Sequence, residues 1–464
     1  MNLRVPVFTA LCAALTASAP ARAQTSDGCV LEDNSTREVT VSNRGTPFES
    51  WFVTEAVFNC PDGRRIVAQT ATYSRAAGQY TLNGAVQVED ADRALTSEFA
   101  QYFIDSGQVH ARTGVVLREK RNGSLIMSEL LDIYQETPER EALVIATGGR
   151  PRAILFQQDS ITGALSDSTT LDAREIRIEG EQSFRGTGSA VLRRDSLTAT
   201  GDAIAFSQDA GQLDVMGGAH VDLPSQDLRG DTIVATIDDQ DQIDAVLARH
   251  GASLVAEDLN VAAPAIRLLF ENGGVERLVA MRWEPPPGME RGPRPHVESE
   301  AFNLDADSID VLAPGQQITS AIAIGNARGE RVIPDSLRSL LPEAEPEVLA
   351  LLSSDWMRGD TVRARFTPNP AAETDTTAAA TIMEQLAAHG TQAQSMYSIR
   401  DESDPAAMLS FNYLLSSYIE VNFLDGLVST VSAAGDAKGI YLQPAEAARV
   451  TGADTLGLAT PPNR

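Results

Sequence analysis

The chain has 464 residues, of which 5% are aromatic and 22% are charged, and its formal net charge is −27. This negative charge argues against a nucleic-acid-binding protein, which needs a basic surface. It also argues against attachment to an anionic membrane by charge attraction.

The first 23 residues have the pattern of a targeting segment. Arg4 supplies the positive start, an apolar run extends to Ala19, and Ala21-Arg22-Ala23 is a small-x-small cleavage sequence. The apolar run is shorter than the ~20 residues of a membrane-spanning helix. The pattern therefore predicts a cleaved secretory signal over 1–23 and an exported mature protein.

Two cysteines follow the predicted cleavage site, Cys29 and Cys60. An exported chain with two thiols most simply forms one disulfide. A redox or metal pair would call for a CxxC sequence or a nearby histidine, and neither accompanies these cysteines. We expect Cys29 and Cys60 to be bridged.

From Arg65 onward the sequence alternates between apolar and polar residues in short runs. Predicted strands include Leu95–Ile104, Val109–Leu117 and Leu125–Tyr134, and the turns between them are rich in Gly, Asp and Asn. Strands of this length and spacing are typical of an antiparallel meander, a sandwich or a solenoid.

The clearest unit is the stretch Leu228–Gly251. Ile233, Ala235 and Ile237 fall on one face of a strand, because side chains alternate along it. Asp238–Gln242 is an acidic turn, a second alternating run follows, and Gly251 is interpreted as the close of the unit. One such hairpin is not stable alone in water, so it must be part of a larger sheet.

This unit recurs along the chain. In Met357–Phe366, Val362, Ala364 and Phe366 take the places of Ile233, Ala235 and Ile237. The Arg-Gly-Asp triplets at Arg229–Asp231 and Arg358–Asp360 are interpreted as turns at the repeat openings. Glycines interpreted as repeat closings are Gly84, Gly114, Gly148, Gly188, Gly218, Gly251, Gly325, Gly390 and Gly435. The early gaps of about 30 to 40 residues are in the range of repeat architectures.

Composition also suggests domain boundaries. We expect N-terminal β repeats over 24–283, a proline-rich linker over 284–296 and a further β repeat over 297–333. Leucines at helical spacing predict a helical linker over 334–356. A C-terminal β repeat is predicted for 357–444 and a disordered tail for 445–464.

The run Ala71–Val86, the Gly-Asp-x-Ile/Val openings and the close at Gly435–Pro444 resemble the OstA/LptA-like family of periplasmic lipopolysaccharide-transport proteins. The resemblance extends over roughly Arg65 to Pro444. It implies an all-β fold of repeated antiparallel strands, an elongated β-jellyroll or β-taco, here with a short helical insert. It also implies a periplasmic or outer-membrane-associated location and lipopolysaccharide or another envelope lipid as partner. Edge-strand pairing with other β-taco proteins of a transport chain is a further implied contact.

The sequence offers no constellation for catalysis or metal binding. The five histidines lack metal-pair spacing, and His250 and His389 each precede a closing glycine, so they are interpreted as structural. Acidic groups such as Asp238–Asp241 do not follow the EF-hand pattern and are interpreted as solvated turns. We therefore expect no enzyme activity, cofactor or metal.

Two main function classes remain. The first is a non-enzymatic lipid carrier with an apolar trough lined by Ile233, Ala235, Ile237, Val362, Ala364 and Phe366. The alternative is an exported β-solenoid enzyme acting on polysaccharide, and a purely structural envelope protein is a third reading. Arg363 and Arg365 lie opposite the apolar face and specify its direction, since unpaired charges are costly to bury. Ala235 and Ala364 leave room for an acyl chain, but apolar periodicity does not separate a trough from a filled core.

Overall fold

The computed structural model describes residues 29–32, 38–61, 63–156, 168–180, 183–223, 225–238, 242–256, 259–282, 292–299, 302–333, 338–342, 345, 348–349, 352–373, 380–401, 403–404, 406–424 and 427–443. The predicted signal over 1–23 and the predicted tail over 445–464 lie outside these residues. The described chain forms two compact units. Unit 1 extends to Glu276 and includes Trp283–Pro293, and unit 2 comprises Arg277–Arg282 and the chain from Arg294 onward.

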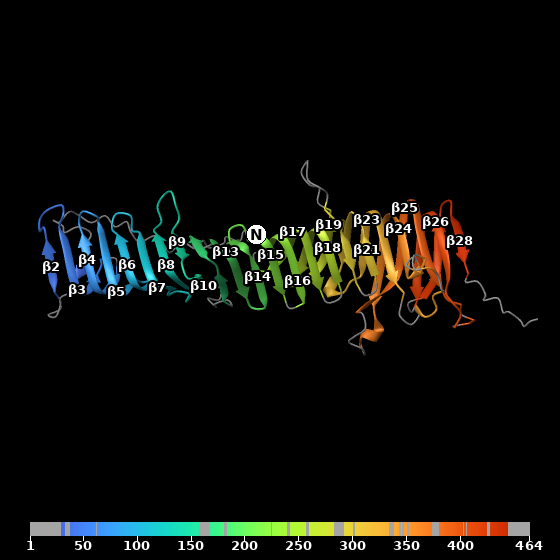
Figure 1. The fold of residues 1–464 in the computed structure, drawn as a ribbon, viewed down its shortest axis with the longest axis horizontal. Helices are drawn as coiled ribbons and strands as arrows, with labels where there is room; N and C mark the ends of the chain where they lie inside the picture. Colours follow the sequence, from blue (N-terminus) through green and yellow to red (C-terminus); the bar gives the residue numbers. More distant parts are fainter. Residues whose placement is uncertain are drawn as a thin grey trace, which may run out of the picture. The chain divides into compact units, whose positions relative to one another are not determined.

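Unit 1 is an antiparallel sheet whose strands lie side by side mostly in chain order (Figure 1). Its strands are β1 (Val30–Leu31), β2 (Val39–Ser42), β3 (Ser50–Asn59), β4 (Arg65–Ser74), β5 (Gln79–Glu89), β6 (Arg93–Phe103), β7 (Val109–Glu119), β8 (Leu125–Tyr134), β9 (Leu143–Thr147), β10 (Arg152–Leu155), β11 (Thr169–Asp172), β12 (Glu175–Glu179), β13 (Ser183–Arg194), β14 (Leu197–Ser207), β15 (Gln212–Leu223), β16 (Gln226–Ile237), β17 (Ile243–Ala256) and β18 (Leu259–Glu271). The predicted hairpin is confirmed as β16 and β17, which pair antiparallel.

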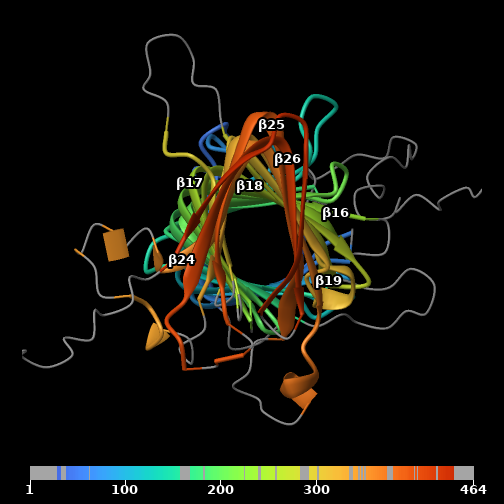
Figure 2. The same cartoon turned by 90° about the vertical axis from the view of Figure 1, so that its right-hand side faces the viewer.

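Unit 2 is also an antiparallel sheet, and it contains the longest strands. It comprises β19 (Gly274–Met281) from Arg277 onward, β20 (His296–Glu298), β21 (Phe302–Asp305), β22 (Ser308–Leu312), β23 (Ser320–Val332), β24 (Ser354–Pro368), β25 (Thr381–Ile399), β26 (Ser410–Leu424), β27 (Leu427–Ala434) and β28 (Lys438–Leu442), with short 3-10 turns at Pro314–Gln316 and Pro370–Glu373. In Figure 2 the β24 and β25 ribbons run along two sides that meet at the top of the view.

The strands of both units bend near the middle, where the pairing register shifts. In unit 1 the shift occurs between Arg229 and Thr232 of β16, and neighbouring strands shift at the corresponding place. In unit 2 it occurs between Arg358 and Thr361 of β24. A β-bulge bends its strand and increases the local twist. Each of these long strands is thereby divided into two arms, so the predicted all-β, β-taco-like fold is confirmed.

The glycines interpreted as repeat closings lie at these bends and not at the ends of repeats, so that interpretation is wrong for most of them. Gly84, Gly188 and Gly251 have φ values of 74°, 82° and 75°. This left-handed backbone is open to glycine and costly for most other residues. The period seen in the sequence is therefore the period of the bend, which recurs in successive strands.

The Gly-Asp pairs interpreted as turns also lie within strands, opposite the bulge of the next strand. A Cβ added at Gly230 would lie 2.9 Å from the carbonyl oxygen of Arg249, and one at Gly359 would lie 2.7 Å from that of His389. Only glycine leaves space for this close backbone approach. The following aspartate serves the same bulge in unit 2, where Asp360 Oδ2 accepts a hydrogen bond of 3.2 Å from the backbone N–H of Thr391.

The two predicted linkers are wrong at their C-terminal ends. Ser354–Trp356, placed in the helical linker, belong to β24, and His296, placed in the proline-rich linker, begins β20. Arg338, Val348, Leu349 and Leu352 are helical, while several residues between them are outside the described part of the chain. Strand pairing overrides local helix propensity at 354–356, since Trp356 pairs with Glu330 and Met396.

Candidate functional site

In unit 1 the predicted residue Ile233 belongs to a row of cross-strand neighbours. We call the arm that contains this row the first arm, and the arm beyond the bend the second arm. In unit 2 the first arm is the one that contains Val362 and Ala364. Each member of this "Ile233 row" pairs with the next, and its apolar side chains are at most 2% exposed. The members are Val53, Ala71, Leu82, Ala100, Ala111, Leu131, Ala146, Ile176, Gly186, Ile204, Val215, Ile233, Ala248 and Ile266. The row crosses unit 1 from β3 to β18 without a polar side chain.

A second row crosses the other arm of unit 1. This "Leu228 row" comprises Phe58, Ile66, Val88, Leu95, Leu117, Ile126, Ala153, Leu171, Leu192, Ala199, Val221, Leu228, Leu254 and Val261. All of its members are buried or half-buried. Burial of such side chains stabilises the fold by about 1.5–3 kcal/mol for each large one.

The two arms of unit 1 face and touch each other. A Cβ added at Gly186, in the Ile233 row, would lie 3.0 Å from Cδ1 of Leu171 in the Leu228 row. At the open ends of the strands, the ring of Phe58 lies 5.6 Å from that of Tyr80 on the other arm, centroid to centroid. The apolar faces are therefore packed against each other where these residues lie.

The three predicted residues of β16 share the inner side of the first arm to different degrees. Ile233 is 1% exposed and Ala235 is 7% exposed, whereas Ile237 is half-buried beyond a second irregularity in the pairing. Thr236, predicted to point outward, is exposed. The sequence thus predicts the facing of this strand correctly, although facing alone does not make it a lipid site.

In unit 2, Val362 and Ala364 belong to two adjacent rows of the first arm. Val362 pairs with Ala323 and Ala388, and Ala364 pairs with Ala321 and Leu386. All are at most 1% exposed. Phe366 lies further along β24, where its ring centroid is 4.6 Å from that of Phe302 on the second arm. Arg363 and Arg365 are exposed on the other face, as predicted.

The second arm of unit 2 carries buried polar groups that the sequence analysis missed. Arg331 and Asp355 form an ion pair with side chains only 7% and 3% exposed, and Nε of Arg331 lies 3.0 Å from Oδ2 of Asp355. Asp355 Oδ1 also accepts a 2.6 Å hydrogen bond from the N–H of Ser398. The Arg331 guanidinium lies 4.4 Å from the ring centroid of Phe423 on the first arm. This arginine therefore bridges the two arms.

An apolar cluster covers the same end of unit 2. Ile333, Leu352, Leu409 and Phe411 are buried together, and Leu340 and Leu341 pack against them. The backbone N–H of Leu409 donates to the carbonyl of Leu340 at 2.8 Å. Segments outside the strands thus close the end of the second arm, which is the role that the predicted linker region performs here.

Unit 1 has an aromatic ladder at the open end of its first arm. Trp51, Tyr73, Tyr80 and Tyr102 are successive cross-strand neighbours. Burial is the main cause that raises the pKa of Tyr80 to about 12, and its neighbours Tyr73 and Tyr102 raise it further. Each tyrosine lies one or two residues from a turn and two residues from a row member, a spacing that could have identified the ladder from sequence.

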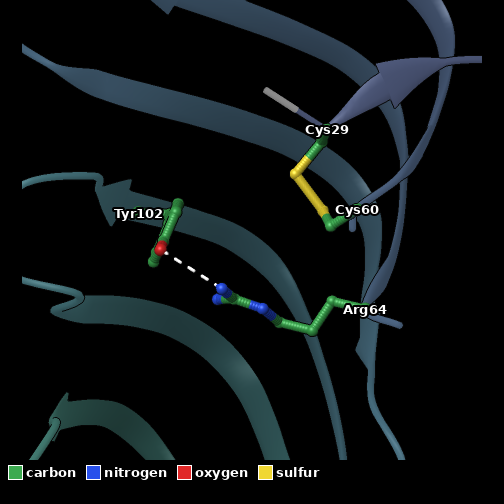
Figure 3. Close-up of a disulfide and its surroundings, with 4 residues drawn as sticks. All are labelled: Cys29, Cys60, Arg64 and Tyr102. Carbon is green, nitrogen blue, oxygen red and sulfur yellow. Dashed lines mark hydrogen bonds between the residues drawn. A yellow bond between two sulfur atoms is a disulfide. The ribbon is translucent and has the colours of Figure 1, made fainter. Parts of the chain in front are cut away.

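The predicted disulfide Cys29–Cys60 is present beside this ladder (Figure 3). It ties β1 to the end of β3, where β1 also pairs. Arg64, close in sequence to Cys60, extends toward the ladder, and its Nη2 donates to the hydroxyl of Tyr102 at 3.4 Å. Its guanidinium lies 5.0 Å from the centroid of the same ring. An arginine and an aromatic ring therefore meet across the open end in each unit.

The histidines are spread over the sheet and do not converge. His110, His220 and His296 are each paired with an aspartate of a neighbouring strand, namely Asp132, Asp227 and Asp305. The hydrogen bond from Arg229 is the main cause that lowers the pKa of Asp227 to about 2. His250 and His389 lie at mid-strand bulges and not in turns. Among the described residues, no group of three or more His, Cys, Asp or Glu side chains could hold a metal ion.

Comparison with known proteins gives a weak similarity to solved structures. No family model matches the chain, and no curated protein matches it. The crystal structure of LptH, the LptA-homologous periplasmic component of the lipopolysaccharide transport device of Pseudomonas aeruginosa, is 14% identical, with a TM-score of 0.17 over 31% of this chain and 76% of that chain. Within the described residues, no helix is long and apolar enough to cross a membrane. A similarity this weak carries no argument about function, so the function is inferred below from the geometry of the two units.

Proposed function

We propose that the protein is a non-enzymatic carrier of an envelope lipid, lipopolysaccharide-like in having several acyl chains, and that it works in the periplasm. Unit 1 would hold the acyl chains between its two arms. The observation that carries the proposal is the pair of uninterrupted apolar rows, the Ile233 row and the Leu228 row, which run across the strands on facing arms. Many members are alanine, so a thin, flexible chain could replace their mutual contacts.

Binding would require the arms of unit 1 to separate. Where their contact is described, the side chain of Leu171 packs against Gly186 of the other arm, and the strand-pairing hydrogen bonds run along the sheet within each arm. An acyl chain would restore the apolar contacts that separation removes, so the change exposes little apolar surface to water. The strands need not be unpaired for this motion. The bulges at the bend are the natural hinge.

A structural envelope protein is the second candidate, favoured by the direct contact of Gly186 with Leu171. The two readings differ in what overpacking does. In a carrier, a bulky side chain on the inner face competes with the lipid. In a permanently filled core there is no lipid to displace, and the substitution costs about 1–3 kcal/mol of stability with no other effect.

The test uses the mature protein recovered from a periplasm and an acyl-chain probe, spin-labelled stearate. Co-purified lipid is first identified by mass spectrometry. We expect the parent to bind the probe and Ala235→Trp to reduce the affinity at least tenfold. Thr236→Trp is the matched control, because this neighbouring side chain is exposed on the same strand. Absence of lipid and of probe binding in the parent would contradict the carrier function and leave the structural one.

A further inference from the structure

Between β3 and β18 the regular bending of unit 1 is interrupted at one place. The other strands of this stretch continue through the bend, but here β9 and β10 are separate, and so are β11 and β12. The second arm continues through β8, β10, β11 and β13, which pair in that order. Gly149 and Arg150 lie in the gap between β9 and β10, and Arg150 has a φ of 64°. A local depression therefore lies in the sheet at this point.

Three arginines line this depression of about 800 Å³: Arg150, Arg152 and Arg193. Arg152 and Arg193 are on the outer face of the second arm, because Ala153 and Leu192 beside them belong to the inner Leu228 row. The guanidinium of Arg150 is held by a 3.0 Å hydrogen bond from Nη2 to the carbonyl oxygen of Ser189. The three cations come from two segments, the chain around the start of β10 and the end of β13, and meet on one surface.

Asp172 forms ion pairs with two of these arginines, Arg152 and Arg193. Its side chain is 9% exposed, although it belongs to the outer face. Nε of Arg152 lies 2.7 Å from Oδ1, and Nη1 of Arg193 lies 3.2 Å from Oδ2. The hydrogen bond to Asp172 raises the pKa of Arg152 further above its ordinary value. The arginine side chains themselves are about half exposed, 52% for Arg152 and 54% for Arg193.

The arginines keep donors for a ligand. A guanidinium has five N–H donors, and in the described contacts Asp172 takes two from Arg152 and one from Arg193. Among the residues that line the depression Asp172 is the one acid, and the side chain of Glu129 packs against Gly149 beside it. Three lining arginines therefore face one lining carboxylate, in a chain whose formal net charge is −27. A local positive excess in so acidic a protein points to an anion.

We infer that this depression binds a phosphate monoester through Arg150, Arg152 and Arg193. A phosphomonoester has a charge of about −1.5 to −2 at pH 7 and three strong acceptor oxygens, which suits three guanidiniums. A carboxylate has a single charge and would duplicate Asp172. An extended polyanion such as nucleic acid would be repelled by the rest of the acidic surface. This site is on the outer face, so it stands apart from the acyl-chain proposal.

The phosphate could belong to a small soluble molecule or to the headgroup of a lipid. Glycerol 3-phosphate is the soluble probe, titrated by calorimetry into the full mature chain at low salt. Vesicles of phosphatidylcholine with and without phosphatidic acid are the lipid probe, tested by co-sedimentation. Binding of glycerol 3-phosphate assigns a soluble ligand. Binding only of the phosphatidic acid vesicles assigns a headgroup, and either outcome supports the phosphate site if the variants below abolish it.

The variants are Arg193→Gln and Arg150→Asn, since asparagine tolerates the left-handed backbone at position 150. We expect each to weaken binding at least tenfold, and a rise in salt to weaken binding by the parent. Arg177→Gln is the control, because this exposed arginine of β12 pairs with Glu175 and does not line the depression. Its affinity should stay within twofold of the parent. Failure of both probes to bind, or equal loss in the control, would overturn the inference, and a thermal melt confirms that each variant is folded.

Discussion

Unit 1 and unit 2 bend their strands by the same device but fill the space between the arms differently. In unit 1 both facing rows are apolar from β3 to β18. In unit 2 the first arm is equally apolar, but the second arm includes the buried pair Arg331–Asp355 and the buried Ser395. An apolar cluster around Ile333 and Leu409 then covers its end. The same strand pattern thus occurs with two interiors. That of unit 1 is the proposed acyl-chain site, and that of unit 2 is held closed by a buried ion pair and an apolar cluster.

The physical basis of the difference is the cost of separating the arms. In the proposed carrier, separation of the arms of unit 1 would exchange apolar contacts for contacts with a lipid chain and would remove the contact of Arg64 with Tyr102 at the first strands. In unit 2 it would also remove Arg331 from Phe423 and expose a charge pair to an apolar ligand that cannot replace its hydrogen bonds. We therefore expect unit 2 to remain closed while unit 1 opens. Three measurements can break or sharpen this contrast.

The largest effect is expected at the buried ion pair of unit 2. Asp355→Ala would remove the carboxylate that pairs with the buried guanidinium of Arg331, at a cost of about 3–5 kcal/mol. Urea unfolding followed by hydrogen exchange should show the loss in unit 2 strands and little change in unit 1. Asp310→Ala is the control, because its partner Arg277 is 46% exposed and such pairs contribute about 0–1 kcal/mol. Equal losses in the two variants would show that the pair does not hold unit 2 closed.

An intermediate effect is expected where a glycine lies between the arms. Gly186→Val in unit 1 and Gly329→Val in unit 2 introduce the same side chain between the arms, from the first arm in unit 1 and from the second arm in unit 2. A Cβ at Gly329 would lie 2.9 Å from Val362, 3.2 Å from Leu304 and 3.3 Å from Leu386, and one at Gly186 would be almost as crowded, 3.0 Å from Leu171 and 3.2 Å from Ala173.

Overpacking costs about 1–3 kcal/mol, and we expect Gly329→Val at the upper end and Gly186→Val at the lower end, because unit 1 relieves the strain by moving its arms apart. Thermal melts measure both. A greater loss for Gly186→Val would mean that unit 1 is the more tightly closed of the two.

The smallest effect is a pH dependence in the aromatic ladder of unit 1. The unfolded tyrosine ionises near pH 10, whereas folded Tyr80 keeps its proton to about 12. The unfolded state therefore loses its proton first, and the stability of unit 1 should fall as the pH rises from about 10 to about 12. Tyr80→Phe should remove this part of the slope. Burial also raises the pKa of Tyr397 in unit 2, so Tyr397→Phe tests whether the slope belongs to unit 1 alone.

Much of the strand architecture was predictable, because period-two alternation reports directly which residues share a face. The exposure of Arg363 and Arg365 and the burial of Val362 and Ala364 follow from that rule alone. The disulfide was predictable for a different reason, since only two cysteines follow the predicted cleavage site, and two cysteines leave one pairing.

Two of the errors share one cause. Gly251 was interpreted as the close of a repeat and the Arg-Gly-Asp triplets as turns, because glycine and aspartate are frequent in turns. The same residues serve a mid-strand bulge, where Gly230 admits the carbonyl of Arg249. Local composition does not distinguish the two, because both need a glycine and a nearby acceptor. The distinction depends on whether the backbone of the neighbouring strand approaches the glycine closely.

The sequence by itself determined that this chain is a set of antiparallel strands with one apolar face, because alternation and breakers act locally along the chain. Only the tertiary structure decided that each strand folds into two arms, that Gly186 meets Leu171, and that Arg150, Arg152 and Arg193 share one depression. The physical reason is that these contacts join residues from different strands or from opposite sides of a bend. The distance between such residues depends on the pairing register and on the position of the bulge, and neither is determined by the sequence of a single strand.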